Sequence, residues 1–259
     1  MTIPRIYSPS ALNKEKLCEL GPDNYKYLKQ VLRLRKGNKI NVFDGFSREF
    51  TAVIKNFSSN GVEVELGKRI PTARKGIKIT LGQAIPKANK MDLIVKSAAE
   101  LGTDVIIPFT AARSVSRIAS EKAPSKVSRW QKISREASRC SRASRITQVA
   151  AIESFASMLE AAGEKSLKMI FWEEEEKRSI KDVLTDKKLD AFRDFFIIVG
   201  PEGGFSKDEV MAAKKADFQS VSLGRQILKV ETAAAAIISI IQYEKGIFSN
   251  FQEVKNARL

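Results

Sequence analysis

Apolar and polar residues alternate along the first 70 residues as they do in strands with one buried face. Three such segments lie at 39–45, 49–57 and 62–70. The first ends at Asp44-Gly45, a dipeptide typical of a hairpin turn, and the turn-forming residues SSNG separate the other two. One helix-like segment, NYKYLKQVLRLR, precedes them. The pattern predicts a small β-barrel with one short helix over residues 1–72.

Strand-like and helix-like segments alternate over residues 73–259. The strand-like segments include IKITLGQA, DVIIPFT, LKMIFW and FFIIVG, and the helix-like ones include KMDLIVKSAAELG, SKDEVMAAKKA and ETAAAAIISIIQYE. This alternation is typical of βα units, so we expect a second, α/β domain with a mainly parallel sheet. Its most apolar segment, AAAAIISII, is about half as long as a membrane-spanning helix, which needs about 20 residues, and is therefore expected to be a core helix.

The charge of the chain points to a polyanionic partner. Lys and Arg number 45 against 30 Asp and Glu, a formal net charge of +15. Such a surplus attracts nucleic acid or an anionic membrane surface, although it also favours solubility alone. There is no histidine, which removes the commonest zinc ligand and the commonest general base. Cys18 and Cys140 show no metal-binding spacing, so we expect a metal-free protein of the reducing cytoplasm.

The segment FFIIVGPEGGFSKDEV (195–210) predicts a bare backbone loop between a buried strand and a helix. Ser206 and Glu209 have the spacing of a capping box, and ligands of parallel sheets bind at this end of the strands. The loop lacks the lysine of a phosphate-binding loop, and the carboxylate of Glu202 would repel phosphate. Glycines that merely turn the chain remain the alternative.

A second segment, VSLGRQILKVETAAAA (221–236), repeats the order of strand, glycine turn and apolar helix. Two such loops at neighbouring strand ends would enclose a small ligand by backbone hydrogen bonds. Because a carboxylate lies between the glycines, a cationic ligand such as S-adenosylmethionine fits better than ATP.

Six further motifs stand in order along the chain: PRIY, VLRLRKG, VFDG, KMDLIVKSAAELG, RSV and RWQKI, and with the two glycine loops they extend over nearly the whole chain. Together they resemble the RsmE-type small-subunit rRNA uridine-N3 methyltransferases of the SPOUT (trefoil-knot) superfamily. The resemblance implies a PUA-like β-barrel followed by a knotted α/β domain. It also implies S-adenosylmethionine as cofactor, methylation of N3 of a uridine in small-subunit (16S) ribosomal RNA, and a homodimer.

The resemblance assigns residues to the cofactor site. They are Ile198, Val199, Gly200, Glu202, Gly203, Gly204, Leu223, Gly224, Ile227, Leu228, Glu231 and Thr232. The chain departs from the family at Gln226 and Lys229, where two arginines are usual, and at Tyr27, where a histidine is usual. Losing two guanidinium groups would weaken any site that relied on bidentate contacts.

Residues 113 to 145 include ten Lys or Arg and two acids, and predict a phosphate-tracking surface on a long helix over about 121–140. Arg129, Arg135, Arg139 and Arg142 are its candidate RNA contacts, extended by Arg5, Arg33 and Arg35 in the small domain. A merely solvated face is the alternative. Trp130 has the spacing of a core residue.

Methylation at N3 of uridine removes a weakly acidic N–H. Glu202 or Glu231 is the candidate base, and Arg113 or Arg225 the candidate cation that stabilises the resulting anion. Two other functions stay open at this point: a ribose 2′-O-methyltransferase of the same superfamily, and a non-catalytic RNA-binding assembly factor.

Overall fold

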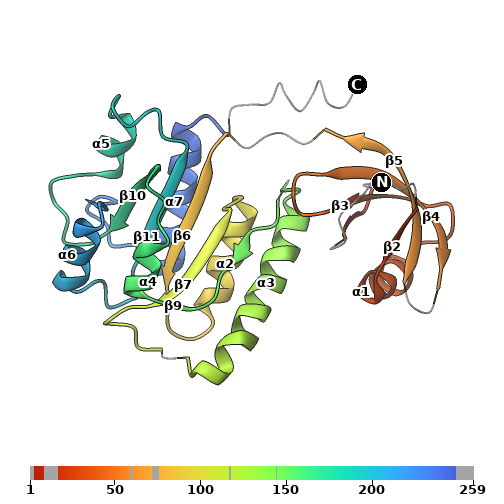
Figure 1. The fold of residues 1–259 in the computed structure, drawn as a ribbon, viewed down its shortest axis with the longest axis horizontal. Helices are drawn as coiled ribbons and strands as arrows, with labels where there is room; N and C mark the ends of the chain where they lie inside the picture. Colours follow the sequence, from red (N-terminus) through yellow and green to blue (C-terminus); the bar gives the residue numbers. More distant parts are fainter. Residues whose placement is uncertain are drawn as a thin grey trace. The chain divides into compact units, whose positions relative to one another are not determined.

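A computed structural model describes residues 3–8, 17–58, 61–71, 76–116, 118–143 and 145–248. The chain forms two compact units (Figure 1). The described residues of Met1–Arg74 and Arg142–Ile146 belong to the first unit, and those of Lys75–Ser141 and Thr147–Asn250 to the second.

The first unit is built on a five-stranded sheet in the order β1-β3-β4-β5-β2. Its strands are β1 (Arg5–Tyr7), β2 (Leu17–Leu20), β3 (Lys39–Phe43), β4 (Glu49–Phe57) and β5 (Val62–Ile70). The three strands expected from alternation are confirmed, and they pair antiparallel as hairpins. The expected helix is shorter than the pattern suggested: α1 (Pro22–Tyr25) continues as the π-helical turn η1 (Lys26–Val31) and ends there.

A segment distant in sequence completes this unit. The described residues 142–143 and 145–146 belong to this unit, and Arg145 forms a bridge with Phe46 in the β3–β4 hairpin. A Cβ on Gly45, which has φ +79°, would lie 3.0 Å from the Ile146 side chain, so glycine allows the close approach. The alternation of apolar residues carries no sign of this contact, because it records only local structure.

The second unit contains a seven-stranded sheet in which every described pairing is parallel. The strand order is β12-β10-β11-β6-β7-β8, and β9 also pairs with β7. The strands are β6 (Lys78–Ala84), β7 (Val105–Thr110), β8 (Gln148–Val149), β9 (Glu153–Ser154), β10 (Ser166–Phe171), β11 (Asp194–Val199) and β12 (Gln219–Val221). The prediction of a mainly parallel sheet is confirmed.

Helices cover both faces of this sheet (Figure 1). One core cluster joins the sheet to α2 (Lys90–Glu100), α3 (Ala123–Cys140), α5 (Ile180–Thr185) and α7 (Val230–Glu244). A second cluster joins the other face to α4 (Phe155–Glu160) and α6 (Lys207–Lys215). The 3-10 turn η2 (Ser120–Lys122) leads into α3. Trp130 is buried in the first cluster, as predicted. Across the described residues, none of the helices is long and apolar enough to span a membrane.

The path of the chain after β10 brings distant loops together. Although β11 follows β10 in sequence, β12 lies on the other side of β10. On leaving β12, Ser222 donates its N–H to the carbonyl of Arg178 (2.8 Å) and accepts the N–H of Ile180 (3.0 Å). The loop after β10 is therefore fastened to the loop after β12. The trefoil knot itself stays a prediction of the family resemblance.

Candidate active site

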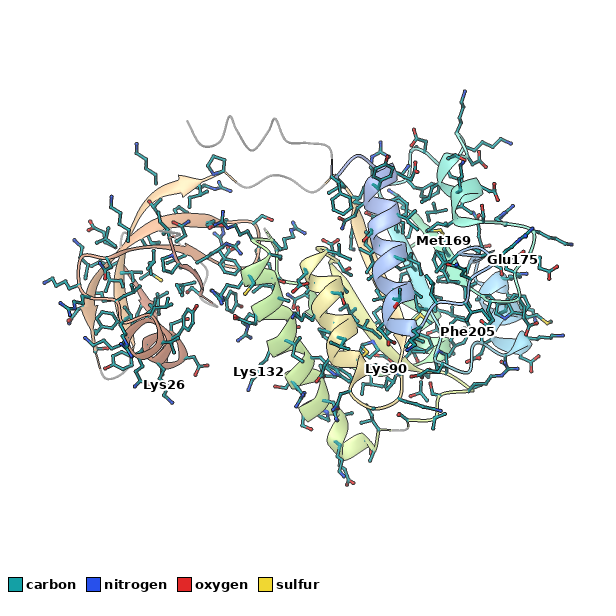
Figure 2. The ribbon with its side chains drawn as sticks, turned by 180° about the vertical axis from the view of Figure 1, so that it is seen from behind. Lys26, Lys90, Lys132, Met169, Glu175 and Phe205 are labelled. Atoms are coloured by element: carbon teal, nitrogen blue, oxygen red, sulfur yellow. The ribbon has the colours of Figure 1, made fainter. Side chains whose placement is uncertain are left out.

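Four neighbouring strands, β12, β10, β11 and β6, run parallel, so the loops that follow them emerge at one edge of the sheet. This edge carries the glycine loop (residues 200–206) after β11 and the second loop (residues 222–229) after β12. Figure 2 shows Lys90 and Phe205 toward the same end of the α/β unit. Both glycine segments thus lie where ligands of parallel sheets bind.

The glycine loop is anchored in the core by Phe205. Its ring is buried and stacks on Phe109, with centroids 6.5 Å apart and planes 3° from parallel. A Cβ on Gly200 would lie 3.0 Å from this ring. Ser206 and Glu209 form the predicted capping box at the start of α6. The loop therefore has one well-packed conformation.

At the two central glycines of the loop, side chains from other loops leave too little room for a Cβ. A Cβ on Gly203 would lie 3.2 Å from the Cβ of Arg113, in the loop after β7. A Cβ on Gly204, which has φ +67°, would overlap the carboxylate of Glu173, in the loop after β10. Gly224 differs, because it has φ +109° but open space around it. Backbone conformation explains Gly224, close approach of a neighbouring loop explains Gly203, and both apply at Gly204.

Glu202 is tied to the loop after β6. Its Oε1 accepts hydrogen bonds from Nζ of Lys90 (2.7 Å) and from the backbone N–H of Lys87 (3.1 Å). Partial burial raises the pKa of Glu202, but these hydrogen bonds outweigh it, and the pKa lies below its ordinary value. The bond to Glu202 raises the pKa of Lys90 in turn. An ionised, hydrogen-bonded carboxylate is a weak base, so the geometry favours a positioning role for Glu202.

Glu231 keeps one oxygen available. It lies in the first turn of α7, and its Oε2 is 3.9 Å from Nζ of Lys90, which is too long for a hydrogen bond. This oxygen is shielded from solvent and has no hydrogen-bond partner in the described part of the chain. A shielded carboxylate oxygen that accepts no hydrogen bond and has only the long ion pair with Lys90 fits a cationic or N–H-bearing ligand. This oxygen is thus suited to either cationic group of S-adenosylmethionine, the sulfonium or the ammonium.

The two candidate arginines differ in their surroundings. Nη1 of Arg113 donates to the carbonyl of Gly203 (3.2 Å), which holds this side chain against the glycine loop. Arg225 is exposed on the second loop. The structure therefore brings Arg113 together with the glycine loop, whereas the role of Arg225 rests on its place in the sequence.

Other predicted cofactor residues divide between core and surface. Ile198 and Val199 are buried in the core clusters on opposite faces of the sheet, so their side chains serve packing. Leu223 and Leu228 are half-buried, Thr232 is exposed, and the side chain of Ile227 is 86% exposed. The second loop therefore presents its backbone groups and apolar side chains at the carboxyl ends of the strands.

Sequence reasoning missed the roles of four residues near the glycine loop: Lys87, Lys90, Glu173 and Glu209. Glu209 was predicted only as part of a helix cap, and its link to a second loop was missed. Lys87 and Lys90 follow the segment IKITLGQA, and Glu173 follows LKMIFW. Both segments were predicted as strands of the same parallel sheet. Applying the strand-end rule to them would have placed these side chains beside the glycine loop.

The arginines predicted to contact RNA lie in different environments. Arg129 forms an ion pair with Asp92 (2.5 Å), whose hydrogen bond raises the pKa of the guanidinium, and Arg139 pairs with Glu136 (2.5 Å). Arg135 is exposed on α3, whereas Arg142 belongs to the first unit. The structure thus places Arg135 at the surface of α3 and gives Arg129 and Arg139 carboxylate partners.

Arg5 is placed differently from the prediction. It is buried, its Nε donates to Glu49 (3.0 Å), and its guanidinium lies 3.6 Å from the centre of the Phe43 ring. It also donates to the carbonyl of Ala143 (2.8 Å). These contacts give Arg5 a role in stabilising the first unit instead of a place on an RNA surface. Arg33 and Arg35 are exposed after η1.

Comparison with known proteins decides the family. A family model described as an RNA methyltransferase domain matches residues 73–242, and one described as an RNA methyltransferase PUA domain matches residues 20–67. The ribosomal RNA small subunit methyltransferase E of Rickettsia conorii is 31% identical over 244 residues, which are 93% of this chain and 96% of that protein. The chain belongs to the ribosomal RNA small subunit methyltransferase E family. The Bacillus subtilis member is 31% identical over 166 residues, 63% of this chain and 65% of that protein.

Solved structures agree with this family assignment. A methyltransferase E from Neisseria gonorrhoeae bound to S-adenosyl methionine has a TM-score of 0.84 at 28% identity, covering 93% of this chain and 98% of that one. A Legionella pneumophila protein in complex with the bound cofactor SAM has a TM-score of 0.82 at 30% identity, covering 94% and 98%. The predicted fold class is confirmed: a PUA-like barrel precedes the α/β methyltransferase domain of the methyltransferase E family.

Proposed function

We propose that this chain methylates N3 of a specific uridine in small-subunit ribosomal RNA, with S-adenosylmethionine as the methyl donor. The observation that carries the proposal is the assembly of Arg113, Glu202 and two glycine loops at one edge of the sheet in a chain of the methyltransferase E family. The relatives named above are ribosomal RNA methyltransferases, and two similar structures contain this cofactor.

The cofactor would be held by backbone groups of residues 200–206 and 222–229 and by the carboxylate of Glu231. Gly224 leaves open space beside its backbone, and Oε2 of Glu231 is the shielded oxygen without a hydrogen-bond partner in the described chain. When bound, S-adenosylmethionine supplies a methyl group made electrophilic by the sulfonium.

The chain's own residues orient the base and stabilise its charge. N3 of uridine lies between two carbonyl groups, so the two carbonyl oxygens take up negative charge when the N3 proton passes to solvent water. The guanidinium of Arg113, fixed by Gly203, is the cation assigned to this charge. The site is proposed to supply cations and orientation instead of a general base. The chain has no histidine, Glu202 is ionised and already hydrogen-bonded, and Glu231 is assigned to the cofactor.

The test is methylation in vitro with S-adenosylmethionine and either naked small-subunit RNA or the assembled particle. Nuclease digestion and mass spectrometry of the product distinguish 3-methyluridine from a 2′-O-methyl nucleotide. Calorimetry with S-adenosylmethionine separates an enzyme from a pure RNA-binding protein. Cofactor binding with 3-methyluridine as product is expected; a 2′-O-methyl product, or no cofactor binding, contradicts the proposal.

We also infer that the chain works as a homodimer in the cytoplasm. The family resemblance motivates the dimer, and Ile227 and Tyr243 add two exposed apolar side chains, 86% and 71% exposed. The apolar stripe of α7 gives no support, because Ala234, Ile237 and Ile241 are buried within the unit's own core. Light scattering at micromolar concentration is expected to give twice the mass of 28.8 kDa, and a monomer would argue against the dimer.

A further inference from the structure

Glu209 makes more hydrogen bonds than a helix cap requires. Its side chain is buried in the first turn of α6. Oε2 accepts the N–H of Ser206 (2.9 Å), which completes the capping box. Oε1 accepts the N–H of Ala112 (2.8 Å), which lies 97 residues away in the loop after β7. One carboxylate thus joins two loops of the candidate site through their backbones.

The loop that Glu209 reaches carries Arg113. Residues 111–114 form a tight turn, in which the N–H of Ala111 donates to Oγ of Ser114 (3.1 Å) and the N–H of Ser114 donates to the carbonyl of Ala111 (3.0 Å). Arg113 in turn donates to the carbonyl of Gly203 (3.2 Å). This turn is therefore fastened to the glycine loop at two successive residues, Ala112 through Glu209 and Arg113 directly.

We infer that Glu209 is a positioning residue for methyl transfer, which fixes Arg113 relative to the glycine loop through the N–H of Ala112. The inference rests on the proposed function, because it gives Arg113 the task of stabilising charge on the target base. Charge stabilisation depends on preorganised geometry, and a displacement of about 1 Å can lower a rate about a hundredfold. A buried carboxylate with two backbone donors is rigid enough to set that geometry.

The variant Glu209→Gln leaves one acceptor oxygen for two N–H groups, so it removes one of the two links. Glutamine also completes capping boxes, so its carbonyl oxygen can keep the hydrogen bond from Ser206. Its amide NH₂ group then faces the N–H of Ala112, and two donors cannot bond to each other. Asp208→Asn is the matched control, because Asp208 is an exposed acid in the same turn of α6. Glu209→Ala removes both links and serves as a second variant.

A double-mutant cycle with Arg113→Ala tests the mechanism. Single-turnover methylation by Glu209→Gln is expected to fall about tenfold to a hundredfold, with little change in S-adenosylmethionine affinity and no change for Asp208→Asn. In the Arg113→Ala background the same substitution is expected to have little further effect. An equal fall in both backgrounds would mean that Glu209 does not act through Arg113.

Hydrogen exchange tests the role of Glu209 without measuring methylation. The N–H of Ala112 is expected to exchange slowly in the wild-type protein and in Asp208→Asn, and at least tenfold faster in Glu209→Gln and Glu209→Ala, as measured by mass spectrometry. Unchanged exchange in folded Glu209→Ala, which has neither acceptor oxygen, would overturn the inference. A wild-type protein that made no methyluridine would defeat the proposed function instead, and the exchange result would still decide whether Glu209 holds this loop.

Discussion

Three glutamates at one sheet edge differ in what their oxygens accept. Glu202 accepts from Lys90 and a backbone N–H, Glu209 accepts two backbone N–H groups, and Glu231 keeps one shielded oxygen without a hydrogen bond to the described chain. The sequence predicts that carboxylates lie here but not how they differ, because their partners come from loops distant along the chain. Partners decide the chemistry of a carboxylate, since they set its pKa and its free lone pairs.

The pH dependence of turnover tests the role of Glu202. Its lowered pKa means that the pair with Lys90 is fully formed above the ordinary value of 4.5 and is lost only as the pH falls through the lowered pKa. Between about pH 5.5 and 8 the rate is therefore expected to show no limb from a titrating carboxylate, and to rise with pH as the uridine N–H ionises more easily. A single-turnover rate that instead levels off above a midpoint near neutrality, as deprotonation of one enzyme group would give, would restore Glu202 as a general base.

Gly200 tests the packing beneath the glycine loop. In Gly200→Ala the new methyl would press on the buried ring of Phe205, 3.0 Å away. Overpacking of this kind destabilises by about 1–3 kcal/mol, measured by denaturant unfolding, and the displaced loop should bind the cofactor more weakly. Gly76→Ala, where the methyl enters open space, is the control and should change stability by less than about 0.5 kcal/mol. Equal effects at both positions would refute the packing account.

At the scale of elements, long periodic segments were predictable and short or distant ones were not. The patterns of β3, β4, β5, β11, α2 and α6 are strong enough to identify each element from sequence. Strands β8 and β9 have two residues each, and the place of residues 142–146 in the first unit depends on Gly45 and Arg5. Tertiary contacts determine such elements, and the local periodicity of the sequence gives no information about those contacts.

The basic face of α3 is testable through its salt dependence. Lys126, Lys132 and Arg135 are exposed on this helix, and Figure 2 labels Lys132 there. Replacing the three by Gln is expected to weaken RNA binding and to lower the log–log salt slope by up to about one unit per lost phosphate contact. Affinity for S-adenosylmethionine should not change. A salt slope equal to that of the wild type would mean that α3 presents only a solvated face.

At the scale of the whole molecule, net charge, fold class and family were accessible from sequence, and the contacts within the site were not. The alternation of elements predicts the parallel sheet, and the strand-end rule places the ligand. The order β12-β10-β11, which fastens Ser222 to Arg178 and Ile180, has no local signature. The division at residues 72 and 73 stays a proposal, to be tested by whether 73–259 folds and binds cofactor alone.

We propose that this chain places a methyl group on N3 of a uridine in small-subunit ribosomal RNA. Mapping of modified nucleotides in ribosomal RNA from a deletion strain, complemented by the wild-type gene or by Arg113→Ala, tests it most directly. One 3-methyluridine should disappear on deletion, return with the wild-type gene, and return only weakly or not at all with Arg113→Ala at equal protein level. An unchanged 3-methyluridine content, or loss of a ribose methylation in its place, would contradict the claim.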